Sequence, residues 1–164
     1  MLTSYELFGF MSPELARRIL EDTATDNKEI YDATLTSVAK VRRVRLIFLK
    51  RKPRNTRHNM VLQTLTRPGF EEAAAGLIRG WLLKHQSRML KSFLDNLKIE
   101  HVDGVVDDLP ETVEDDILTS AVEVLLETNE KEIVILYLHA FLSMNGMGWT
   151  NLENMLAVDV RLQF

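Results

Sequence analysis

Apolar residues recur every three to four positions along most of the chain, which is the spacing of an amphipathic α-helix. The pattern predicts a short helical segment at the start and then helices over residues 13–25, 28–50, 55–65, 70–97, 110–127, 129–146 and 150–164. The fold class expected from this pattern is all-α, a compact bundle of about six or seven helices.

One predicted helix differs from the others because it is apolar on every side. The run from Ile133 to Leu142 has no polar face, which is the mark of a helix at the centre of a bundle. Its β-branched start would also fit a buried strand. No second run of this kind exists to pair with it, and an isolated strand leaves its backbone groups unsatisfied, so we predict a central helix.

Local signals mark several helix ends and one close contact. Ser12 is expected to cap the first long helix, and either Asp26 or Asn27 the second. Gly76 and Gly80 stand four residues apart in a later helix. Because glycine inside a helix costs about 1 kcal/mol relative to alanine, we expect both to admit a neighbouring helix at close range.

Residues 99–107 do not follow the helical pattern. Asp103 and Gly104 indicate a turn, and the residues on either side of it would form at most a minimal hairpin. We expect this segment to be the main surface connection between the helices.

Composition limits the class of protein. The chain has 164 residues, 46% of them hydrophobic and 27% charged, which is typical of one globular domain, so we predict a single domain over residues 1–164. It has no cysteine, which excludes disulfides, thiolate metal ligands and thiol nucleophiles. The start lacks a basic leader, and the longest apolar run is about half the length that crosses a bilayer. These features together predict a cytoplasmic protein without a transmembrane segment.

Charge is strongly segregated along the chain. Residues 33–70 contain ten Lys or Arg and no Asp or Glu, whereas residues 99–164 contain fourteen Asp or Glu against two basic residues. The formal net charge of -4 therefore hides a basic N-terminal part, 1–98, and an acidic C-terminal part, 99–164. The basic segment could be neutralised by the acidic half of the same molecule, by that of a neighbouring copy, or by an external polyanion.

The densest positive charge lies between residues 40 and 57. Guanidinium groups suit phosphates and carboxylates, because each can make two parallel charge-assisted hydrogen bonds. The candidate residues for binding a polyanion or a protein partner are Lys40, Arg42, Arg43, Lys50, Arg51, Lys52, Arg54 and Arg57. Phe48 is the one aromatic residue of the segment and is expected to face the core, which argues against a stacking platform for single strands. Contact with a membrane surface is disfavoured by the acidic C-terminal part.

Motifs for catalysis or cofactor binding are absent. There is no Gly-x-Ser-x-Gly elbow and no phosphate-binding glycine loop, and the four histidines lack the spacing of a zinc helix. The best local metal candidate is His101 with Asp103, Asp107 and Asp108, although an acidic solvated loop explains the same residues. We therefore predict no catalytic residue, no metal and no cofactor.

The sequence favours a non-enzymatic helical domain that works by protein–protein interaction or self-assembly through complementary basic and acidic faces. The alternative is a module that binds the RNA or DNA backbone through residues 40–57. A weaker alternative is an enzyme that uses His85 or His139. Trp81 and Trp149 have no neighbouring motif, and both are expected in the core.

Overall fold

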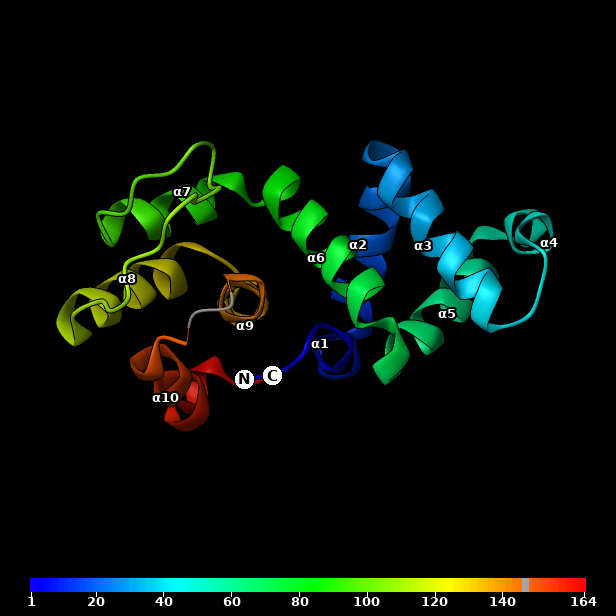
Figure 1. Ribbon diagram of the computed structural model, residues 1–164. Helices are drawn as coiled ribbons and strands as arrows, with labels where there is room; N and C mark the ends of the chain where they lie inside the picture. Colours follow the sequence, from blue (N-terminus) through cyan, green and yellow to red (C-terminus); the bar gives the residue numbers. More distant parts are fainter. Residues whose placement is uncertain (146–147) are drawn as a thin grey trace. The chain divides into compact units, whose positions relative to one another are not determined.

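The computed structural model describes residues 1–145 and 148–164, and this part of the chain is built from helices without a β-sheet. The α-helices are α1 (Ser4–Phe10), α2 (Pro13–Asp26), α3 (Lys28–Val41), α4 (Leu46–Arg51), α5 (Arg54–Leu65), α6 (Glu71–His85), α7 (Ser87–Asn96), α8 (Asp115–Thr128), α9 (Lys131–Asn145) and α10 (Thr150–Val158) (Figure 1). Two 3₁₀ turns, η1 (Pro68–Phe70) and η2 (Val160–Leu162), complete the order. The predicted all-α class is confirmed, although the described residues form more helices than predicted.

The chain divides into two compact units. The N-terminal unit is Thr3–Trp81, and the C-terminal unit is Leu82–Phe164 together with Met1–Leu2. The N-terminal unit contains fourteen Lys or Arg and nine Asp or Glu, a formal charge of +5, whereas the C-terminal unit contains six and fifteen, a charge of -9. The charge segregation of the sequence therefore follows the two units. That the two units fold together as a single domain over residues 1–164 stays a prediction.

In the N-terminal unit, the predicted caps set the start of two helices. Ser12 Oγ accepts a hydrogen bond from the N–H of Leu15 at 3.1 Å, and Asn27 Oδ1 accepts one from the N–H of Ile30 at 3.4 Å. Asn27 is thus the cap of α3. The helices bury a common apolar core, in which the fully enclosed side chains include Leu7, Ile19, Leu20, Leu35, Val38, Leu65, Leu77 and Ile78.

The two glycines of α6 differ in their surroundings. A methyl group at Gly80 would lie 2.5 Å from Cδ1 of Ile30, so α3 and α6 approach closely there, as predicted. A methyl group at Gly76 would meet no atom within 4 Å, and the prediction is wrong for this position.

The helix predicted over residues 28–50 is broken in two. Arg43 has φ 53°, the N–H of Arg43 bonds to the carbonyl of Lys40 at 3.2 Å, and the N–H of Val44 bonds to that of Ala39 at 3.0 Å. This pair of bonds around a left-handed residue is a Schellman motif, which ends α3 at Val41. The apolar spacing continues through the break because Leu49 of α4 is also buried. The spacing of apolar residues therefore predicted which side chains are buried, and it could not show whether one helix or two helices carry them.

Three other predicted helices also have different bounds. The helix expected over residues 150–164 ends at Val158, and the 3₁₀ turn η2 follows it. The helix over residues 70–97 is divided at Gln86, whose φ of -119° departs from helical geometry. The helix expected from Pro110 begins at Asp115. The residues before it are not helical, and the start of α10 and the residue before it hold them. The Nε1–H of Trp149 donates to the Pro110 carbonyl at 2.9 Å, and the side-chain amide of Asn151 donates to the Val113 carbonyl at 2.8 Å.

Helix α9 lies at the centre of the C-terminal unit, as predicted. Every residue from Ile133 to Leu142 is buried, and Tyr137 and Phe141 pack edge-on against Phe93 of α7 with ring centroids 5.4 and 5.5 Å apart. The residue types at Asn145 and Gly146 predict a helix stop there, and Gly146 lies outside the described residues. The minimal hairpin is also present, as an isolated antiparallel bridge between Val102 and Val105 around the turn at Gly104.

Candidate docking surface

The eight candidate residues lie on α3, α4 and α5 of the N-terminal unit and in the turns that join these helices. The three helices follow one another in Figure 1. Helix α4 is only six residues long and follows α3 through the turn at residues 42–45. Pro53 then starts α5 immediately after α4. We call the exposed part of residues 40–57 the basic surface.

Three of the predicted residues are held by neutral groups of the same unit. Arg42 Nε donates to Thr64 Oγ1 at 2.8 Å, and Arg54 Nη2 donates to the main-chain carbonyl of Glu21 at 3.2 Å. Arg57 Nη1 donates to the main-chain carbonyl of Lys50 at 2.7 Å. These contacts orient the side chains, and they leave the positive charges without a carboxylate counterpart.

The remaining candidates differ in how they are bound. Lys50 forms an ion pair with Asp32 at 2.9 Å. Lys52 lies over the ring of Phe48, with its Nζ 4.3 Å from the ring centroid. Lys40, Arg43 and Arg51 are exposed, and within residues 1–145 and 148–164 they make no ion pair.

Within the described N-terminal unit, carboxylates pair with little of the basic surface. Of the eight predicted residues, Lys50 is the only one in an ion pair with a described carboxylate. The arginines that could bind an anion in the described structure are Arg42, Arg43, Arg51, Arg54 and Arg57, and none has a carboxylate partner there. Guanidinium groups are suited to charge-assisted hydrogen bonds with carboxylates and phosphates.

Apolar side chains lie exposed among these charges. Val41 is 52% exposed, Ile47 56% and Phe48 49%. The prediction that Phe48 faces the core is wrong: after the break at Arg43, α4 buries Leu49 and turns the ring of Phe48 outward. The sequence pattern does not distinguish two short helices from one continuous helix, because each arrangement buries an apolar residue at every third or fourth position.

The buried side chain of His58 joins two of the helices that carry the basic surface. Tyr31 Oη and His58 Nε2 are 2.9 Å apart, and both side chains are buried. Burial lowers the pKa of His58 below its usual range, and the positive charges of Arg54 and Arg57 lower it further. The imidazole is thus neutral, and it forms a fixed contact between α3 and α5.

His139, named as a possible catalytic residue, lies in the core of the C-terminal unit. Its Nδ1 accepts a hydrogen bond from the N–H of Leu2 at 3.2 Å, and its ring stacks on Phe164. Burial, with a smaller effect of the N-terminal ammonium, lowers the pKa of His139 to about 4. Since Nδ1 already accepts a bond, the neutral ring has no free lone pair for a proton. His85, the other named histidine, is half-buried near the end of α6.

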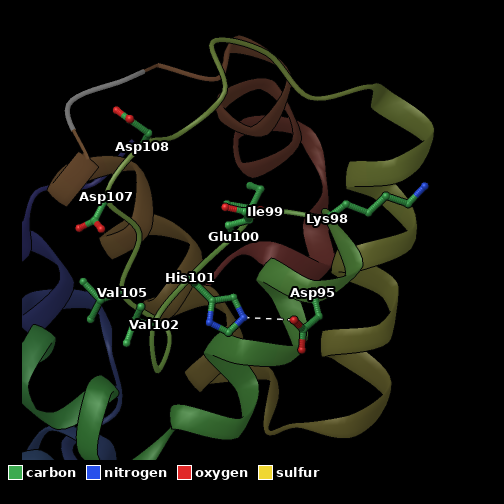
Figure 2. Close-up of a pocket in the computed structure, with 9 residues that line it drawn as sticks. All are labelled: Asp95, Lys98, Ile99, Glu100, His101, Val102, Val105, Asp107 and Asp108. Carbon is green, nitrogen blue, oxygen red and sulfur yellow. Dashed lines mark hydrogen bonds and ion pairs between the residues drawn. The ribbon is translucent and has the colours of Figure 1, made fainter.

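The metal candidate of the sequence is not assembled. Figure 2 shows His101 directed at Asp95, with Nε2 donating to Oδ1 at 3.1 Å, while Nδ1 accepts from the N–H of Gly104 at 3.2 Å. Asp103 pairs instead with Lys91 at 2.7 Å. Both imidazole nitrogens are therefore occupied, and the described residues contain no group of three ligands that could hold a metal ion.

His101 and Asp95 also border the hollow drawn in Figure 2, on the surface of the C-terminal unit. Its volume is about 760 Å³. Its lining is mostly acidic and apolar, consisting of Asp95, Lys98, Ile99, Glu100, His101, Val102, Val105, Asp107 and Asp108. Asp107 and Asp108 lie at one end of the hollow in this view, and Asp95 and Lys98 at the other.

Comparisons with known proteins do not place the chain in a family: no family model, curated protein or solved structure matches it. None of the described helices has the length and apolar character that a membrane span requires.

Proposed function

We propose that this protein is a non-enzymatic interaction module whose basic surface docks an acidic protein surface. The observation that carries the proposal is the coexistence, on α3–α5, of arginines without carboxylate partners and of three exposed apolar side chains. Charge steers a partner and fixes its orientation, while burial of apolar area supplies affinity. A protein partner that carries carboxylates next to aliphatic or aromatic groups satisfies both requirements. The lack of cysteine fits the cytoplasm, which is the location we propose.

A selection from a displayed peptide library tests this proposal. The wild-type protein serves as bait, and the variant Phe48→Ser/Arg51→Glu serves for counter-selection, because both side chains are exposed and are not needed for the core. We expect enriched peptides to combine Asp or Glu with aliphatic or aromatic residues. Lack of enrichment, or enrichment that the variant retains, would contradict a role for the basic surface.

The second candidate function is binding of an RNA or DNA backbone, and a specific observation favours it. The five arginines without carboxylate partners could bind phosphates, and the exposed ring of Phe48 offers one base a stacking surface. Fluorescence anisotropy with labelled single- and double-stranded RNA and DNA tests it, from about 50 to 200 mM salt, where phosphate-driven affinity falls steeply. Binding that weakens with salt and is lost in Arg43→Glu/Arg51→Glu would favour this candidate over a protein partner.

Catalysis by His139 gains no support from the geometry. His139 is enclosed by Leu2 and Phe164, and its accepting nitrogen is already used. A general base needs a lone pair within reach of a substrate.

A further inference from the structure

Helix α4 exposes a face that its own unit does not cover. In its six residues Leu49 is fully buried, whereas Ile47 and Phe48 are about half exposed. Arg51 is the last residue of α4 and Lys52 follows it, and neither has a carboxylate partner in the described part of the chain. The face is therefore an apolar pair bordered by two positive charges.

The hollow of the C-terminal unit has the opposite character. Val102 is 73% exposed and Val105 42%, so the bridge presents two apolar side chains to solvent. Glu100, Asp107 and Asp108 border them and have no ion pair among the described residues. Asp95 is hydrogen-bonded to His101, and Lys98 is the one Lys or Arg among the lining residues.

We infer that the α4 face of one molecule docks into the Val102–Val105 hollow of a second copy of this chain. The inference rests on the proposed function: the acidic protein surface that the basic surface docks is the hollow of another copy. Each surface pairs exposed apolar side chains with unpaired charges, and the charges have opposite sign. The units that carry them have formal charges of +5 and -9, so the approach of unlike units of two copies is electrostatically favoured.

This contact joins two different surfaces. In a pair of bound molecules, one copy keeps a free hollow and the other a free α4 face, so further copies can add and association is head-to-tail. An isologous dimer, in which the same surface meets itself, would bring like charges together. Head-to-tail contact predicts oligomers that grow with protein concentration and dissociate with salt.

Sedimentation velocity of two variants and their mixture tests the inference. The α4 variant is Phe48→Asp/Arg51→Glu, and the hollow variant is Val102→Lys/Asp107→Lys; all four side chains are exposed. Controls with charge changes elsewhere are Arg67→Glu/Arg79→Glu for the first and Glu111→Lys/Glu127→Lys for the second. Circular dichroism verifies that each variant keeps the helical content of the wild type.

We expect the wild type and both controls to sediment above the monomer mass of 18.9 kDa at high concentration. Each docking variant alone should bind its own copies at least about tenfold more weakly. Their equimolar mixture retains one intact α4 face and one intact hollow, so association should return.

Two results would overturn the inference: a wild type that stays monomeric at low salt and high concentration, or a mixture that associates no better than either variant alone. The first would leave the proposed function standing if the peptide selection still enriches acidic peptides dependent on Phe48 and Arg51. Failure of both experiments would remove the proposed function as well.

Discussion

Arg57 Nη1 donates a hydrogen bond to the main-chain carbonyl of Lys50 at 2.7 Å, which ties α5 to the last turn of α4. Carbonyls at a helix end have no partner within the helix, and a guanidinium group is a suitable donor for one. The guanidinium carbon of Arg57 also lies 6.0 Å from the ring centroid of Tyr31. Arg57 therefore positions the basic surface, whereas Arg51, which makes no contact of this kind, is available to a partner.

The two arginines should respond differently to truncation. Arg57→Ala removes a charged donor from a helix end and is expected to lower the free energy of unfolding by about 1 kcal/mol. Arg51→Ala should change it by less than about 0.5 kcal/mol, because the residue is exposed and unpaired. Urea denaturation of both variants measures the difference. Equal losses would show that the Lys50 contact does not stabilise the fold.

The glycines of α6 provide a matched pair of substitutions. Gly76→Ala should raise the free energy of unfolding by up to about 1 kcal/mol, since alanine favours a helix and the new methyl group meets no atom. Gly80→Ala introduces the same group 2.5 Å from Ile30 Cδ1, so its gain should be smaller or reversed. Thermal melts compare the two variants. A larger gain at residue 80 would contradict the close approach of α3 and α6.

His139 makes stability depend on pH. Its pKa is about 4 in the folded chain and has the usual value of 6.5 when unfolded, so below pH 6.5 the unfolded chain binds a proton that the folded chain rejects. The contribution of His139 is therefore complete above pH 6.5 and is lost toward pH 4, at up to about 1.4 kcal/mol per pH unit.

The variant His139→Gln, which keeps an acceptor for Leu2, should lose less stability between about pH 7 and pH 5 than the wild type does. Urea denaturation at each pH gives the two profiles. Wild-type and variant profiles that fall in parallel would mean that His139 is accessible to protons in the folded chain. His58 contributes in the same direction in both proteins, because its pKa is also lowered.

The two tryptophans report on the two units separately. Trp81 is buried in the N-terminal unit and donates to Asp22 Oδ2 at 2.8 Å, while Trp149 is buried in the C-terminal unit. The unit boundary falls within α6, so loss of either unit removes packing from part of that helix. In each of the variants Trp81→Phe and Trp149→Phe, which keep one tryptophan each, we expect the denaturation midpoint by fluorescence to coincide with the midpoint by circular dichroism of the same variant. Separate midpoints would contradict the prediction of a single domain.

The sequence predicted the parts of the fold that depend on burial. The all-α class and the central position of Ile133–Leu142 follow from apolar spacing, and the turn at Gly104 follows from its residue types. The break at Arg43 could not be predicted, because a left-handed arginine has no sequence signature comparable to glycine. Phe48 is exposed because of that break. The charged residues of the basic surface were therefore predictable from the sequence, and its exposed apolar residues were not.

The most direct test of the basic surface as a protein-docking site is a comparison of wild type and Phe48→Ser on two labelled probes. The probes are an amphipathic peptide of glutamate and leucine and a single-stranded RNA, both measured by anisotropy at about 150 mM salt. We expect the wild type to bind the peptide more tightly than the RNA, and Phe48→Ser to weaken peptide binding about tenfold without a change in unfolding free energy. Tighter binding of RNA, or a peptide affinity that is the same in the variant, would contradict the account.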